Sequence, residues 1–130
     1  MMMQIPSDQE FDEMISQAID TLPKRDIENL QNVVIAYADE PDEYQREKIN
    51  LRGDTLLLGL YEGIPLTERG AGYNLVLPDK ITLFKQPLVY YAQSKGSKLE
   101  EEVRHTLWHE IAHFYGLNHD DIHKILIWSK

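Results

Sequence analysis

The most informative segment of this sequence is His109-Glu110-Ile111-Ala112-His113-Phe114-Tyr115-Gly116-Leu117-Asn118-His119. It has the form H-E-x-x-H-x-x-G-x-x-H. An α-helix rises about 6 Å over four residues, so His109 and His113 are expected on one face of a helix, one turn apart. Two imidazole rings in that arrangement can converge on one zinc ion. The segment therefore predicts a metal-binding helix near the carboxyl end.

The other residues of the segment have separate expected roles. Glu110 follows the first ligand, and its carboxylate can reach a water on the metal without binding the metal itself, which makes Glu110 the candidate general base. Gly116 can adopt the left-handed conformation that commonly ends a helix. The chain can then turn back and bring His119 to the metal as third ligand, with Asp120 or Asp121 as alternatives. Three protein ligands leave a fourth position open, which is typical of a catalytic zinc site.

All histidines of the chain lie within 19 residues: His105, His109, His113, His119 and His123. Histidine is the side chain most often used to bind transition metals. Surface histidines on helical faces would explain one or two of the five, but not this crowding. His105 lies one turn before His109, and we expect it to pack or to support a ligand. His123 is a candidate hydrogen-bond or proton donor.

Length and charge exclude several classes of protein. A chain of 130 residues with 42% hydrophobic residues is expected to form a single domain over residues 1–130. With 13 basic and 22 acidic residues, the net charge is −9, which argues against binding to nucleic acid or to anionic lipid. The absence of cysteine excludes disulfides, thiol nucleophiles and thiolate metal ligands.

Nothing in the sequence suggests export or membrane insertion. The first residues lack the basic stretch and apolar core of a signal peptide, and acidic residues follow directly. No apolar run approaches the roughly 18–20 residues that span a bilayer. We therefore expect a cytoplasmic protein that does not enter membranes.

Hydrophobic spacing and turn residues predict the order of elements. Helices are expected over residues 8–22, 24–30, 87–93, 99–116 and 120–128, and strands over 33–38, 55–61, 73–77 and 80–85. Ser7 with Glu10, and Ser97 with Glu100, have the form of capping boxes. Residues 33–38 are expected to be a buried strand, and residues 41–54 a linking loop with room for one helical turn. Trp108 and Phe114 are expected in the core. This order predicts an α+β fold, with helices packed on a small mixed sheet and the active-site helix near the carboxyl end.

The histidine segment resembles that of the zincin peptidases of metzincin type. Only 11 residues follow His119, which leaves no room for the Met-turn of metzincins. The closer resemblance is to the minimal zincins, a family of small bacterial zinc metallopeptidases. It covers most of the chain and includes Leu58-Gly59-Leu60-Tyr61-Glu62-Gly63-Ile64-Pro65-Leu66-Thr67-Glu68-Arg69 and Leu77-Pro78-Asp79-Lys80-Ile81-Thr82-Leu83-Phe84. The family often has aspartate at the position of His119. The resemblance implies a compact zincin-like core, a zinc ion and peptidase activity.

The leading functional hypothesis is zinc-dependent hydrolysis of a peptide or protein, with Glu110 as the base. The substrate is expected to lie extended along a sheet edge, at residues 73–77. Arg69, Tyr73 and His123 are candidates, by residue type, for stabilising the oxyanion.

Two other hypotheses come from different classes. The first is a non-catalytic, zinc-binding protein-interaction module whose acidic amino-terminal part docks on a basic partner. The second is a metal-dependent endoribonuclease, because small enzymes of that kind share the metal spacing. Those enzymes have glycine where this chain has Glu110, and the acidic charge also disfavours RNA as a substrate.

Overall fold

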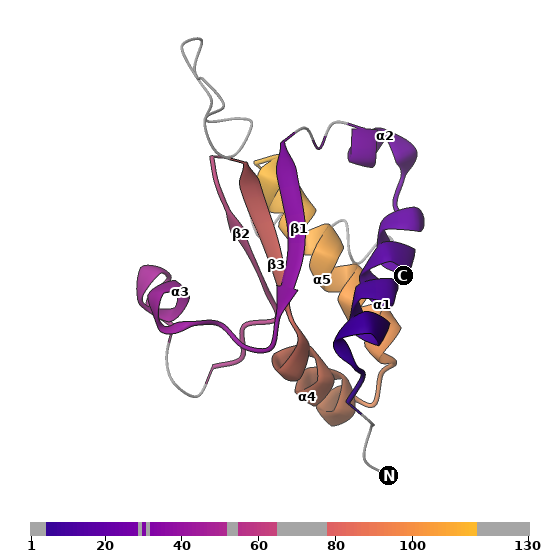
Figure 1. Cartoon of the computed structure of the whole chain (residues 1–130), viewed down its shortest axis with the longest axis vertical. Coiled ribbons are helices and arrows are strands. Elements are labelled where there is room, and N and C mark those ends of the chain that lie inside the picture. The colour runs from indigo at the N-terminus through magenta and orange to yellow at the C-terminus, as the bar shows by residue number, and fades with distance from the viewer. Residues whose placement is uncertain (1–4, 29, 31, 52–54, 65–77, 117–130) are drawn as a thin grey trace.

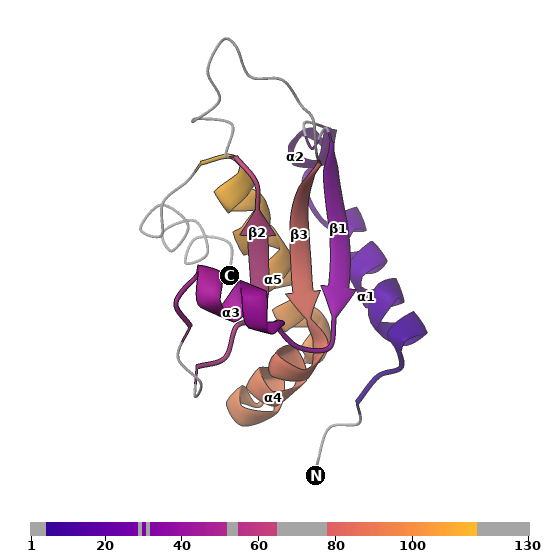
Figure 2. The ribbon, with the colours of Figure 1, turned by 60° about the vertical axis from the view of Figure 1, so that its left-hand side comes forward.

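Three strands form one mixed sheet, and helices α1 and α5 lie against one of its faces (Figures 1 and 2). The structure is a computed structural model that describes residues 5–28, 30, 32–51, 55–64 and 78–116. In chain order the elements are α1 (Asp8–Asp20), α2 (Lys24–Glu28), β1 (Val33–Ala38), α3 (Glu43–Lys48), β2 (Gly59–Glu62), β3 (Asp79–Phe84), α4 (Lys85–Lys95) and α5 (Leu99–Phe114). The predicted α+β fold, with a helix near the carboxyl end, is confirmed.

The central strand of the sheet is β3. The order is β1-β3-β2, with β1 parallel and β2 antiparallel to β3. Ile35 lies opposite Ile81 in the parallel pair, and Tyr61 lies opposite Ile81 in the antiparallel pair. The sheet is therefore mixed, as predicted, and β1 and β2 lie at its edges among the described strands.

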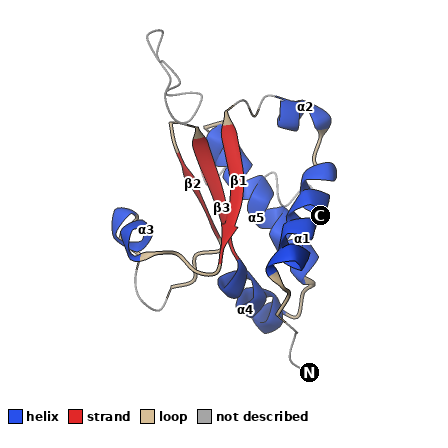
Figure 3. Ribbon diagram, viewed as in Figure 1, coloured by secondary structure: helices blue, strands red, loops and turns tan. Residues whose placement is uncertain are grey.

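Helices cover one face of the sheet (Figure 3), and the hydrophobic core lies between these helices and the sheet. Apolar residues of α1, β3, α4 and α5 meet there with little or no exposed surface: Phe11, Ile15, Ala18, Ile81, Leu83, Leu88, Val89, Ala92, Leu99, Val103, Leu107 and Ile111. The α1 and α5 members recur at three or four residues, and the β3 members at two, which places each set on one face of its element. This packing fixes α5 against the sheet.

Two polar contacts hold the amino-terminal helix in place. Ser7 and Glu10 form the predicted capping box, with each side chain accepting a hydrogen bond from the other residue's backbone N–H. The buried Nζ of Lys85, at the start of α4, donates to the Pro6 carbonyl at 3.2 Å and to Asp8 Oδ1 at 2.7 Å. The start of α1 is thereby tied to the junction of β3 and α4.

Three local predictions are wrong. The strand over residues 33–38 is only half-buried, because it lies at an edge, and Val34 is 45% exposed. Helix α5 starts with Lys98 as N-cap and has no side-chain cap, since the Ser97 hydroxyl donates to Glu102 instead. Trp108 is half-buried, because it lies beside the buried face of α5, whereas Phe114 is in the core.

The other differences are smaller. The linking segment contains α3, which begins with a capping box of Asp42 and Gln45 that the sequence analysis did not identify. The predicted strand over 73–77 and helix over 120–128 lie outside the described residues. None of the helices in the described part of the chain is long and apolar enough to cross a membrane.

Candidate metal centre

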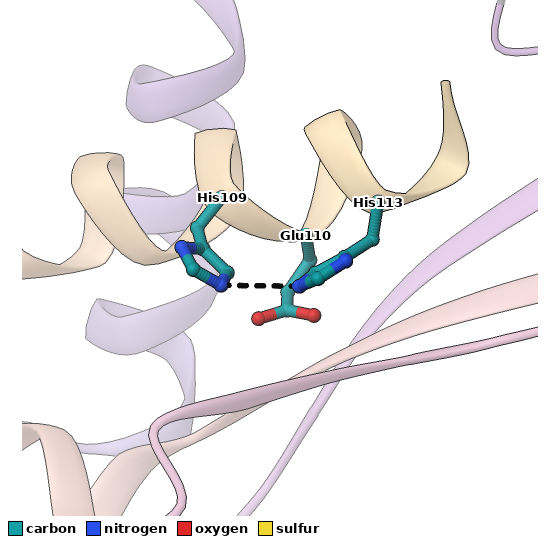
Figure 4. A group of neighbouring side chains, drawn as sticks. All are labelled: His109, Glu110 and His113. Carbon is teal, nitrogen blue, oxygen red and sulfur yellow. Dashed lines mark hydrogen bonds between the residues drawn. The ribbon is translucent and has the colours of Figure 1, made fainter. Parts of the chain in front are cut away.

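Helix α5 brings the side chains of His109 and His113 together (Figure 4). Their Nε2 atoms lie 3.1 Å apart and their ring centroids 4.8 Å apart. Both residues are half-buried. The one-turn spacing therefore has the predicted effect, and the two nitrogens point toward the same place.

This arrangement fits a zinc ion. Two nitrogens bound at about 2.0–2.1 Å in a tetrahedral site are about 3.3 Å apart, and the observed separation is 3.1 Å. Donor atoms of His109, Glu110 and His113 all lie within 4.8 Å of one another. Imidazole nitrogen with a nearby carboxylate is a donor set that zinc favours. His109 and His113 are thus suited to hold the metal from one side.

Glu110 is buried beside these two rings and extends from α5 toward the sheet (Figure 4). Only 7% of the residue is exposed. Burial destabilises the charged form and raises the pKa of Glu110 to about 7, although a hydrogen bond from the backbone N–H of Tyr61 favours the carboxylate and lowers the pKa in part. A carboxyl group whose pKa is close to neutrality can both accept and release a proton.

Strand β2 lies unusually close to α5 at this point. A Cβ atom on Gly59 would be 2.7 Å from Thr106 Cγ2 and 3.2 Å from Glu110 Cγ. A side chain at this position would push the strand away from the helix, so glycine is what allows the close approach. The approach places the Tyr61 N–H within reach of the Glu110 carboxylate.

The end of α5 also follows the prediction. Tyr115 is the C-cap, and Gly116 has a φ of 85°, in the left-handed region. The Gly116 N–H donates to the His113 carbonyl at 2.9 Å, and the Tyr115 hydroxyl donates to the Asp26 carbonyl at 2.6 Å. The helix that carries both histidines is therefore fixed at its last turn.

Several predicted site residues fall outside the described part of the chain. His119, its alternatives Asp120 and Asp121, and His123 belong to 117–130. Arg69 and Tyr73 belong to 65–77. The third ligand and the oxyanion donor therefore stay predictions. His105 is described, and its Nδ1 lies 3.8 Å from the buried Glu102, so its described ion-pair partner is not one of the two candidate ligands.

Comparison with known proteins agrees with this geometry. Residues 30–128 match the family described as zincin-like metallopeptidase. The chain belongs to this family. No curated protein matches the zincin-like chain. Among solved structures, it is similar to a conserved hypothetical protein of T. thermophilus, with 23% identity and a TM-score of 0.55 over 82% of this chain and 92% of the other. At that identity the likeness shows a shared fold.

Three residues of this zincin-like site were not predicted from the sequence, and they link Glu110 to the sheet. Gly59 and Tyr61 lie on β2, and Asp79 is the first residue of β3. All three fall in the two segments that resemble the minimal zincins, which was the available signal. Their roles depend on contacts between β2, β3 and α5, which are far apart in sequence.

Proposed function

We propose that the chain is a zinc-dependent peptidase in which Glu110 is the general base. One observation carries this proposal: a buried carboxyl group lies beside two converging imidazole nitrogens on the same helix. Membership of the zincin-like metallopeptidase family supports it.

His109 and His113 would hold the zinc ion, and His119 is the proposed third ligand. When bound, zinc would lower the pKa of a coordinated water and polarise the carbonyl of the scissile bond. The chain's contribution is the orientation of the donors, since both histidines are fixed on a packed helix whose last turn is tied to α2.

Glu110 would take a proton from the attacking water and return it to the leaving amine. Both transfers need a group whose protonation changes near the working pH. In the metal-free chain, burial raises the pKa of Glu110 to about 7, and the Tyr61 N–H fixes one side of its carboxylate.

The proposed substrate is a peptide or an extended segment of a protein that lies along the sheet edge. Residues 73–77, the predicted position of this edge, lie outside the described residues. Of the described strands, β2 lies at an edge of the sheet and also contacts α5. A peptide would bind there by strand addition, through outward backbone groups of β2 other than the Tyr61 N–H, which donates to Glu110.

The test combines metal analysis with a peptide-library assay. We expect the full-length protein to bind zinc in a one-to-one ratio and to cleave peptides. A chelator should abolish cleavage while the far-ultraviolet circular dichroism stays that of a folded protein, and added zinc should restore cleavage. If the protein unfolds when zinc is removed and the zinc-loaded form cleaves nothing, the metal is structural and the interaction-module hypothesis replaces the peptidase. Cleavage of structured RNA without peptide cleavage would favour the endoribonuclease.

A further inference from the structure

We propose that Tyr61 and Asp79 form a positioning pair that holds the Glu110 carboxylate through the backbone of β2. This inference rests on the proposed function, because it assigns roles within the same site. Both residues lie outside the histidine segment, on the two strands that pack next to it.

The register of β2 directs the Tyr61 N–H away from β3. The Phe84 N–H donates to the Leu58 carbonyl at 3.0 Å, which makes these two residues a hydrogen-bonded pair. In an antiparallel ladder such pairs alternate with pairs whose backbone groups face outward. Leu60 therefore bonds toward Thr82, while Tyr61, opposite Ile81, has its N–H and carbonyl on the outer side. That outward N–H donates to Glu110.

The side chain of Tyr61 is anchored at both its ring and its hydroxyl. The ring packs edge-to-face on Phe114 with centroids 6.2 Å apart. The hydroxyl donates to Asp79 Oδ2 at 2.6 Å, and Asp79 is only 3% exposed. A short hydrogen bond to a buried carboxylate is stronger than one between neutral groups. The position of Tyr61 is therefore fixed with respect to both α5 and β3.

On either side of Tyr61, β2 passes so close to neighbouring residues that only glycine fits. A Cβ atom on Gly59 would lie 2.7 Å from Thr106 Cγ2, and one on Gly63 would overlap the carboxyl group of Asp79. Asp79 thus fits between the Tyr61 hydroxyl and the backbone at Gly63. The strand is therefore closely packed on both sides of Tyr61. A change in the Tyr61–Asp79 contact would move this strand and, with it, the Tyr61 N–H.

The predicted consequence is a loss of catalytic rate without a loss of metal. Removal of a group that orients a site residue typically costs about 10–100-fold in activity. We expect Tyr61→Phe, which keeps the ring on Phe114, to lower kcat about 10-fold and to leave KM and zinc content nearly unchanged. The matched control is Tyr90→Phe, because Tyr90 lies on α4 and is 61% exposed.

The direct readout is hydrogen exchange at the backbone amide of residue 61, measured on the metal-free full-length chain. In the wild type this amide should be protected, and Glu110→Ala should speed its exchange at least about tenfold, since the acceptor of its hydrogen bond is lost. Tyr61→Phe should also raise the exchange rate of this amide. The amide of Leu60, which bonds toward β3, should stay protected and thereby report that the sheet is intact.

A double variant tests the pairing itself. Asp79→Ala should speed exchange at residue 61 as Tyr61→Phe does, and the double variant should add little to either, because both remove one contact. If the two substitutions raise the exchange rate of amide 61 independently, so that their effects multiply in the double variant, the proposal is overturned. An unchanged exchange rate of amide 61 in Tyr61→Phe would also overturn it. If Tyr61→Phe does not fold, Asp79→Asn replaces it. The asparagine amide oxygen is a weaker acceptor for the Tyr61 hydroxyl than a carboxylate. A rise in the exchange rate of amide 61 that is smaller than that in Asp79→Ala supports the proposal, and no rise overturns it.

The amide measurement needs no substrate and no activity. If the wild type cleaves no peptide but amide 61 responds as described, the peptidase proposal fails and the positioning pair stands. If peptides are cleaved but amide 61 does not respond, the positioning pair fails alone.

Discussion

The Nε2 atoms of His109 and His113 lie 3.1 Å apart on successive turns of α5, and the carboxylate of Glu110 lies beside them. The two histidines and the glutamate depend on different properties of the fold. The helical repeat brings the histidines together, whereas the packing of β2 on α5 buries Glu110. Substitutions at each position should therefore have separable effects.

Loss of one histidine should weaken zinc binding strongly. Loss of a residue that only orients a metal ligand lowers metal affinity about 10–100-fold. Loss of a ligand itself should cost more, so His113→Ala should weaken zinc binding by at least about 100-fold. Isothermal titration with zinc measures this effect. His105→Ala is the control, because His105 contacts Glu102 and is not one of the converging donors. Equal losses in the two variants would contradict the assignment of His113 as a ligand.

Glu110 should make the metal-free protein less stable as the pH rises. Its folded-state pKa of about 7 lies above the ordinary value of 4.5, so its contribution to stability is complete below pH 4.5 and is lost as the pH rises through 7. Between pH 5 and pH 8, the free energy of unfolding should therefore fall by roughly 2 kcal/mol relative to that of Glu110→Gln. Urea unfolding at both pH values, with chelator present, measures the difference. A constant difference between the two proteins would show that Glu110 is not buried in this way.

Gly59→Ala should disturb both stability and activity. The new Cβ would meet Thr106 Cγ2 at 2.7 Å, and overpacking of this kind costs about 1–3 kcal/mol. Thr106→Ser removes the Cγ2 atom, so the double variant should recover part of the lost stability. Thermal unfolding of the two single variants and the double variant tests this. Absence of any recovery would mean that the strand is not held against the helix at this contact.

Lys85→Met should loosen the amino-terminal helix. The substitution removes hydrogen bonds from the buried ammonium group to the Pro6 carbonyl and to Asp8, at a cost of about 1–3 kcal/mol. Lys95→Met is a suitable control, because the Lys95 side chain is 48% exposed. Urea unfolding should separate the two variants. We expect zinc affinity to be unchanged in both, since α1 does not contribute a ligand.

Local signals in the sequence predicted most of the described elements. The capping box of Ser7 and Glu10, the left-handed Gly116 and the one-turn spacing of His109 and His113 depend on residues at most four positions apart. Such features follow from helix geometry and from backbone preferences alone. The histidine spacing was sufficient for the convergence of the two described histidines, and the hydrophobic spacing of the helices and strands was sufficient for the fold class.

Features set by the sheet order could not be predicted in this way. A β-branched run such as residues 33–38 has the same composition at an edge as in the centre, so the exposure of Val34 was not anticipated. The link from Asp79 through Tyr61 to Glu110 joins two strands and a helix. The raised pKa of Glu110 follows from that packing, so it too needed the tertiary structure.

The most direct test of the peptidase proposal is the cleavage rate of Glu110→Gln, compared with that of the wild type at equal zinc content. Glu101→Gln, an exposed change in the first turn of the same helix, is the matched control. General-base catalysis contributes about 10²–10⁴-fold to the rate. We therefore predict that Glu110→Gln binds zinc but cleaves the peptide at least about 100-fold more slowly than the wild type. The control should cleave at the wild-type rate. Undiminished cleavage by the zinc-loaded Glu110→Gln variant would contradict the proposed role of Glu110.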